Sequence, residues 1–523
     1  MMGLSATSRR LRRLLRRPFA TEAGVAPTVP AARATPYVGK NLHKAMKRAA
    51  HPGNKPDIVF DIFWKHCSHF VPTLMDVDAF ITALAKCRLS GTVADAERLL
   101  DFLPHIEKGL CSGHMDPDCG RYYATVAWSL TKLAKAQPPL PGTVLAQFPA
   151  IFAKVDDVAR PALQMGVFLP QHISKLAWSF AKCSCGSQAL FREICTAARA
   201  QVQQFVPREF SNLLWALAVV RVKDDDVLWH APREIVTRWG PALEGFTEQD
   251  VSNIAWSYAT LQVPQRELFQ RISSAVETRT SEFTTVALVT TTWAFATLRE
   301  DAPFARAATK NLEQRLEQVD VRGCAMLLWA LATLKYEEWM ELFFVSIADR
   351  RVKPEVDMFH AQDVSNCLWA FATLRVMHTD AFELLATRAV KILDTANAQA
   401  ITNVTWSCAK MQFKTPGLYE SVVNEALRRS LRTWPPQSIS LFSWALAEVG
   451  YTDVRLSEAI AGELQARREA FNDVDLATLA HFFRAEERAV FRGAHSPAVI
   501  ALTCIAAEVR RRALPRTKEA LEM

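Results

Sequence analysis

The stretch NLLWALAVVRV, residues 212–222, decides the fold, because variants of it recur along the chain. Further copies are NIAWSYATLQV at 253–263, MLLWALATLKY at 326–336 and NCLWAFATLRV at 366–376. Aligning on the tryptophan finds nine copies, at Trp128, Trp178, Trp215, Trp256, Trp293, Trp329, Trp369, Trp406 and Trp444. Successive tryptophans are 50, 37, 41, 37, 36, 40, 37 and 38 residues apart. A fixed period of this length is typical of a repeat protein.

Each repeat contains two helices. In one clear unit, residues 246–263 form the first, with Thr247 and Asp250 in a capping-box arrangement, and residues 265–283 form the second. Strand-like alternation does not occur, which argues against a propeller. With degenerate copies at 81–87 and 476–487, the chain has eleven units of roughly 38 residues. We therefore expect an all-α solenoid superhelix, in which stacked pairs bury a continuous core.

The repeated helix has one apolar and one polar side when its residues are placed 100° apart. Counted from Trp256, the places −5, −2, −1, +2 and +5 carry apolar side chains and form the predicted core. Places +1 and +3 are almost always Ala or Ser, which allows neighbouring helices to approach closely.

The tryptophan shares its side with places −7, −4, −3 and +4. Arg or Gln occupies −7 in eight of nine units: Arg121, Gln171, Arg208, Gln249, Arg322, Gln362, Gln399 and Gln437. Asn occupies −3 in four, at Asn212, Asn253, Asn366 and Asn403. Amides and guanidinium groups beside an aromatic ring suit single-stranded RNA, whose bases stack and present their edges. The alternative is that Trp packs between repeats and that Asn holds a neighbouring loop.

Basic residues recur at +4 or +6 in seven of nine units: Lys132, Lys182, Arg221, Arg299, Lys335, Arg375 and Lys410. They either complement the helix dipole or form a track for phosphates. The candidate RNA-binding residues are Arg208, Asn212, Arg221, Gln249, Asn253, Arg299, Arg322, Lys335, Gln362, Asn366, Arg375, Gln399, Asn403 and Lys410.

The first nineteen residues carry six arginines and no acid, which is typical of an amphipathic mitochondrial presequence. The pattern RPFA at 17–20 predicts cleavage after Phe19; a basic tail is the alternative. Cleavage would lower the formal charge from +8 to +2, so net charge hardly supports polyanion binding. We expect a Pro/Ala-rich linker over 20–56, the solenoid over 57–490 and a C-terminal helical cap or tail over 491–523.

The Trp-centred phrases resemble the repeats of octotricopeptide and heptatricopeptide repeat proteins, and of the related FAST kinase-like and RNA-editing substrate-binding-complex proteins. The resemblance covers about residues 75–490. It implies an organellar RNA-binding factor acting in RNA processing, stability, editing, translation or ribosome assembly. Many such proteins end in a nuclease-like RAP domain, but here the tail after Phe483 is short and looks helical, which puts cleavage activity in doubt. Pentatricopeptide or HEAT-like repeats are the alternatives for the fold.

Catalytic signatures do not occur in the sequence: it has no phosphate-binding loop, HExxH or GxSxG motif. Cys111, His114 and Cys119 form one weak metal cluster, with His105 or Asp116 as a fourth ligand, but an inserted loop explains them more simply. His66, Cys67 and His69 lie within an apolar helix and fit packing better. We therefore expect neither an enzyme nor a cofactor or metal.

Two functions stay open. The first is RNA binding in the mitochondrial matrix, or alternatively in a plastid, with RNA-processing proteins or the mitoribosome as partners. The second is a structural scaffold or a lineage-specific mitoribosomal subunit that reads no RNA sequence. Neither requires a membrane span or a small-molecule substrate, and every apolar segment is too short for a span.

Overall fold

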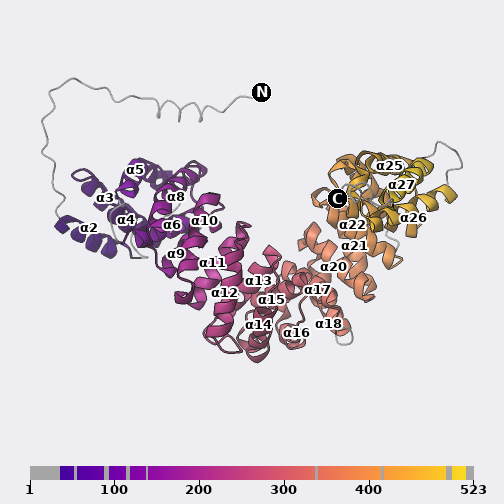
Figure 1. Cartoon of the computed structure of the whole chain (residues 1–523), viewed down its shortest axis with the longest axis horizontal. Coiled ribbons are helices and arrows are strands. Elements are labelled where there is room, and N and C mark those ends of the chain that lie inside the picture. Colours follow the sequence, from indigo (N-terminus) through magenta and orange to yellow (C-terminus); the bar gives the residue numbers. More distant parts are fainter. Residues whose placement is uncertain are drawn as a thin grey trace, which may run out of the picture.

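The computed structural model describes residues 36–51, 56–87, 93–112, 118–136, 139–335, 340–413, 417–489 and 497–513. All regular elements in these ranges are helices, and they form one curved array (Figure 1). The predicted all-α solenoid is therefore confirmed. None of the described helices is long and apolar enough to cross a membrane. The predicted presequence at 1–19 lies outside the described residues.

Eleven helices, each carrying one of the predicted units, form an inner row in which every helix contacts the next. They are α4 (Leu74–Lys86), α6 (Cys119–Ala134), α9 (Pro170–Lys182), α11 (Pro207–Val219), α13 (Glu248–Leu261), α15 (Thr285–Leu298), α17 (Val321–Leu334), α20 (Ala361–Leu374), α22 (Ala398–Lys410), α24 (Pro436–Glu448) and α26 (Asp473–Ala489). In the middle of the array α13, α15 and α17 lie toward the hollow of the arch (Figure 1). The repeated phrase therefore forms the concave layer.

The second helix of each unit lies in an outer row. These helices are α5 (Val93–Cys111), α8 (Phe148–Gln164), α10 (Gln188–Ala200), α12 (Asp225–Arg238), α14 (Arg266–Thr278), α16 (Ala305–Gln314), α18 (Met340–Ile347), α21 (Thr379–Lys391), α23 (Leu418–Arg429), α25 (Val454–Arg467) and α27 (Pro497–Ala513). In Figure 1, α12, α14, α16 and α18 follow the outer edge of the arch. Short 3₁₀ turns, such as Val202–Gln204 and Thr280–Glu282, lead into several inner helices.

The predicted core side of the inner helix is buried. Val251, Ile254, Ala255 and Tyr258 are fully buried in α13. The residue at +1 is fully buried in all nine units, at Ser129, Ser179, Ala216, Ser257, Ala294, Ala330, Ala370, Ser407 and Ala445. Three of the four serines donate within their own helix, as Ser257 does to the Asn253 carbonyl at 2.6 Å, whereas the Ser129 hydroxyl lies 3.1 Å from that of Thr82 on the preceding inner helix. Because Ala and Ser are small, and because the buried serine hydroxyls have hydrogen-bond partners, the inner helices can pack closely.

Local signals set the ends of the inner helices. The predicted capping box of α13 is confirmed, because the Asp250 amide donates to the Thr247 hydroxyl at 3.2 Å and the Thr247 amide donates to the Asp250 carboxylate at 3.1 Å. At the other end, the +6 residue has the left-handed conformation in eight of nine units, at Ser184, Arg221, Gln262, Arg299, Lys335, Arg375, Gln412 and Gly450. Glycine fills only one of these eight places, although it tolerates this conformation best.

The N-terminal end differs from the prediction. The segment expected to be a linker, 20–56, contains helix α2 (Pro36–Ala49), which packs against α4 and pairs with α3 (Pro56–Cys67). Leu42 and Met46 of α2 are buried, so this pair extends the array by one unit. The linker prediction was wrong here because six of the fourteen residues of α2 are Lys, Arg, His or Asn, so its apolar pattern is weak in the sequence.

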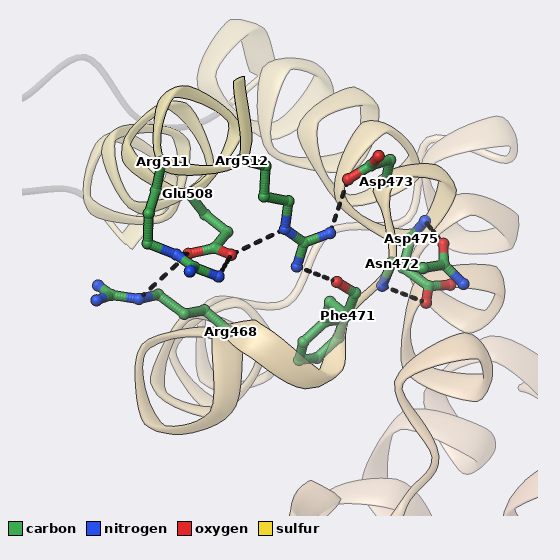
Figure 2. A network of polar contacts seen from close by, with 8 residues as sticks. All are labelled: Arg468, Phe471, Asn472, Asp473, Asp475, Glu508, Arg511 and Arg512. Carbon is green, nitrogen blue, oxygen red and sulfur yellow. Dashed lines mark hydrogen bonds and ion pairs between the residues drawn. The ribbon is translucent and has the colours of Figure 1, made fainter. Parts of the chain in front are cut away.

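At the C-terminal end α27 packs against α25 and α26. Glu508 of α27 is fully buried and accepts hydrogen bonds from Arg511 and Arg512, while Arg512 also contacts Asp473 and the Phe471 carbonyl (Figure 2). The bonds from Arg511 and then Arg512 lower the pKa of the Glu508 carboxyl to about 2. An ionised, fully bonded carboxylate therefore helps to hold the last outer helix in place.

Candidate nucleic-acid interface

A groove of about 920 Å³ runs along the concave side of α4, α6, α9, α11 and α13. We call it the inner groove. The places that line it are those predicted from the helix angle: −7 (Gln171, Arg208, Gln249), −3 (Thr125, Lys175, Asn212, Asn253), the tryptophan (Trp128, Trp178) and +4 (Lys132). The structure therefore brings together amides, guanidinium, ammonium and aromatic groups from five consecutive inner helices.

The candidate residues at −7 and +4 or +6 are exposed: Arg208, Arg221, Gln249, Arg299, Arg322, Lys335, Gln362, Arg375, Gln399 and Lys410. The four asparagines at −3, Asn212, Asn253, Asn366 and Asn403, are half-buried. Of these fourteen residues, Arg208, Asn212, Gln249 and Asn253 line the inner groove. Arg322, Gln362 and Gln399 occupy the equivalent place on later inner helices.

Some of these polar groups bond to one another. The Asn253 amide donates to the Ser211 hydroxyl of the preceding inner helix at 3.3 Å. The Gln362 amide donates to the Asn366 side-chain oxygen at 3.0 Å within α20. Asn253 thus ties together two inner helices, where the alternative interpretation expected a bond to a loop. Each amide still has further hydrogen-bonding capacity.

The tryptophans pack between repeats. Ring centroids lie 6.3 Å apart for Trp178 and Trp215, 6.4 Å for Trp215 and Trp256, and 6.3 Å for Trp329 and Trp369, with interplanar angles of 30–35°. Every one of these rings is half-buried. The geometry supports the packing interpretation, while part of each ring stays accessible from the groove.

The recurring basic residues fall into two sets. Those at +4 lie beside tryptophan: Lys132 Nζ is 5.4 Å from the Trp128 ring centroid, and Lys182 Nζ is 5.7 Å from that of Trp215. Those at +6 lie where the inner helix ends. Lys335 and Arg375, from neighbouring repeats, line one hollow of about 390 Å³ together with Glu341. The single basic track predicted from the sequence is therefore divided: Lys132 lines the inner groove, whereas Lys335 and Arg375 lie at the ends of later inner helices that the groove does not reach.

Four cations, Lys86, Lys132, Lys175 and Arg208, line the inner groove together with the carboxylates of Glu209 and Asp250. Burial and then the charge of Arg208 lower the pKa of Lys175, against an opposing effect of Asp78. The pKa of His172 is likewise lowered by burial and then by Lys175 and Arg121. Positive groups this close repel one another, and a bound anion would relieve that repulsion. Cations outnumber carboxylates in the groove by four to two, which favours an anion there despite the small net charge.

The sequence analysis missed a second repeated feature, on the outer row. An arginine near the end of the outer helix donates to a backbone carbonyl just before the inner helix of its own repeat. The pairs are Arg238 with Phe205 (2.9 Å), Arg279 with Phe246 (3.1 Å), Arg315 with Phe283 (3.1 Å), Arg388 with Phe359 (3.3 Å), Arg467 with Leu431 (2.8 Å) and Arg512 with Phe471 (2.6 Å). The first five of these arginines follow Trp by 19 to 23 residues, a recurrence visible in the sequence. Each of these bonds connects the two helices of one repeat.

The two weak metal clusters have other surroundings. His66 Nε2 lies 3.2 Å from the Asp76 carboxylate, and burial followed by Asp76 raises the pKa of the Cys67 thiol to about 11. Cys111 is exposed and Cys119 is buried, whereas His114 and Asp116 lie outside the described residues. Among the residues that the structure places, no three His, Cys, Asp or Glu side chains form a group that could hold a metal ion.

Comparison with known proteins gives one family. No curated protein matches the chain. One solved structure, "Homology model of the full-length AP-3 complex in an intermediate open conformation", aligns at 9% identity over 90% of this chain and 87% of that chain, with a TM-score of 0.24. That score is too low to support an argument. Residues 242–484, from just before α13 into α26, match the family model described as RNA-editing substrate-binding complex 6 protein, which confirms the predicted resemblance to such proteins over this part of the chain.

Proposed function

We propose that this protein binds single-stranded RNA along the inner groove. The observation that carries the proposal is that one groove is lined by exposed −7 amide and guanidinium groups from three inner helices, by half-buried −3 residues from four, by two tryptophans and by four cations. RNA bases stack on aromatic groups and are recognised at their edges by amides, while lysine and arginine neutralise phosphates. Because the inner helices are stacked in a row, amides, cations and aromatic rings recur along the length of a bound RNA strand.

The family similarity supports a role in an RNA-editing or related RNA-processing assembly. The matching family is named for an RNA-editing substrate-binding complex, and the matched segment includes α13, the last of the five inner helices that line the groove. The arginine-rich first nineteen residues support a mitochondrial matrix location. We propose a binding role within such an assembly, without catalysis by this chain.

The helix ends supply a further argument for a ligand. Arg221, Arg299, Lys335 and Arg375 are exposed and have φ angles of 55–57°. A side chain in this conformation costs about 1 kcal/mol or more relative to glycine. Four long cations at left-handed positions, where glycine would be less strained, are explained if their positive charge binds a ligand. We infer that they contact RNA phosphates at the ends of α11, α15, α17 and α20, the last three of which lie beyond the inner groove.

A charge-matched pair of variants tests the proposal. The groove variant changes Lys86, Lys132, Lys175 and Arg208 to Ala, all of which line the inner groove. The control changes four exposed outer-helix residues to Ala, namely Arg192, Arg233, Arg306 and Lys310. Both lose four positive charges, so long-range electrostatics is nearly equal, and circular dichroism establishes that both are folded.

Binding to fluorescently labelled single-stranded RNA is measured by anisotropy from 50 to 200 mM salt. If each groove cation neutralises one phosphate, the salt slope falls by about 0.7 per phosphate, or about 3 for the groove variant. The control should keep most of the wild-type slope. Equal losses in both variants would refute the groove as the site.

Cross-linking and sequencing of RNA bound to the tagged protein in the organelle then identifies the transcripts. A defined transcript set that is lost in the groove variant supports RNA binding in the cell. If a folded wild-type protein recovers no RNA but is found in a large assembly, the scaffold function replaces this proposal. The tryptophan packing between repeats is the observation that favours that second function.

A further inference from the structure

A second cavity, of about 470 Å³, lies at the N-terminal end of the concave face. It is lined by His43 from α2, Met75 and Asp78 from α4, and Arg121, Tyr122 and Thr125 from α6. We call it the Asp78 pocket. Thr125 lines both this pocket and the inner groove, so the two are adjacent. Helix α2, which was absent from the sequence prediction, forms the end wall.

The carboxylate of Asp78 has an unused acceptor. Its Oδ1 is buried and accepts no hydrogen bond from any residue that the structure describes. Burial raises the pKa of Asp78 to about 6, against the opposing charges of His43, Arg121 and Lys175 and a hydrogen bond with Thr82. The group is therefore ionised at neutral pH and above. A buried carboxylate oxygen without a donor is costly, so the pocket is suited to a ligand that supplies N–H groups.

Arg121 provides a flat surface in the same pocket. Its guanidinium carbon lies 4.6 Å from the centroid of the Tyr122 ring, and its Nη2 donates to the Tyr122 hydroxyl at 2.8 Å. The Arg121 side chain also lies 3.7 Å from the Asp118 carboxylate and is 52% exposed, so two neighbours hold the guanidinium while part of it stays accessible. A guanidinium plane held in this way can stack on a nucleobase.

We propose that the Asp78 pocket binds one unpaired guanine of the RNA that lies in the inner groove. The Asp78 carboxylate accepts from guanine N1–H and from its 2-amino group, and the base stacks on Arg121. Guanine alone among the four bases presents two adjacent donors on its pairing edge. Adenine and cytosine present a donor beside an acceptor, and uracil presents one donor between two carbonyls, which would repel the carboxylate. This inference rests on the proposed function.

The test uses the full chain at pH 8 and three nine-nucleotide oligouridines that carry a single central guanine, inosine or adenine. Inosine keeps N1–H but lacks the 2-amino group. We expect the wild-type protein to bind the guanine oligonucleotide about tenfold more tightly than the adenine one, with inosine between them, as two aligned hydrogen bonds to a base would give. The Asp78→Asn variant should bind all three within about twofold.

Asp101→Asn is the matched control, because it removes the same charge from an exposed place on outer helix α5. It should keep the preference for guanine. The ratio between oligonucleotides is compared within each variant, so a general gain in affinity from the lost negative charge does not affect the result.

The outcomes separate the two proposals. Equal binding of the three oligonucleotides by the wild-type protein, or a guanine preference that survives Asp78→Asn, overturns the guanine pocket and leaves RNA binding by the groove intact. If the folded wild-type protein binds none of them even at 50 mM salt, the proposed function fails and the pocket proposal with it.

Discussion

Replacing the left-handed residue at the end of an inner helix should separate folding from ligand binding. In α15 the residue is Arg299, at φ 57° and ψ 36°, and the Glu300 amide bonds the Phe295 carbonyl at 3.0 Å, which closes the helix. Arg299→Gly and Arg299→Ala remove the same charge, but only glycine relieves the conformational cost of φ above zero.

The magnitude follows from two opposing terms. A non-glycine residue in the left-handed region costs about 1–2 kcal/mol, and glycine costs about 0.5–1 kcal/mol in extra unfolded-chain entropy. Arg299→Gly should therefore be about 0.5–1 kcal/mol more stable than Arg299→Ala. Making the change at Arg221, Arg299, Lys335 and Arg375 together should give about 2–4 kcal/mol between the quadruple Gly and Ala variants. Lys335 and Arg375 share one hollow, so those two can couple.

Urea unfolding followed by circular dichroism measures this difference as a shift in midpoint between matched variants. RNA anisotropy on the same samples should show equal losses of affinity, because both quadruple variants lack the same four cations. A Gly variant that is no more stable than its Ala counterpart would refute the reasoning about strain. Unequal RNA affinities would show that helix-end conformation, and not charge, controls binding.

Three other changes test the remaining structural conclusions. Arg238→Ala should lower the free energy of unfolding by about 1–3 kcal/mol, because the Phe205 carbonyl loses its donor, whereas the exposed control Arg233→Ala should change it by less than about 0.5 kcal/mol in urea titrations. Trp215→Ala should cost about 3 kcal/mol in the same assay and Trp215→Phe clearly less, since the ring packs on its neighbours in both adjacent repeats; equal costs would argue against the packing. Burial raises the pKa of Glu486 to about 7, so from about pH 4.5 to 7 the folded state holds a proton that the unfolded state has lost, and stability falls as pH rises through this window. Glu486→Gln should make the fall in melting temperature over this window smaller, and the part that remains includes the contribution of Asp78, whose pKa is also raised.

Much of the fold was predictable because it is encoded locally and repeated. The Trp period gave the eleven inner helices, the 100° placement gave the buried side with Val251 and Ile254, and the Thr247 capping box gave a helix start. Each depends on residues within a few turns of one another, so composition and spacing suffice. Averaging over nine copies strengthens these weak signals.

Other features needed the tertiary structure, because they join residues from different helices. The sequence indicates which side the tryptophans share, but the packing of Trp178 on Trp215 depends on how closely two inner helices approach. The bond from Arg238 to Phe205 spans 33 residues, and the Asp78 pocket combines three helices, one of which was taken for a linker. The sequence by itself therefore determined the repeat and its two faces. Only the stacking of the repeats decided which polar groups bond to a neighbouring helix and which face the groove. The sequence of one repeat does not show how closely the next repeat approaches it.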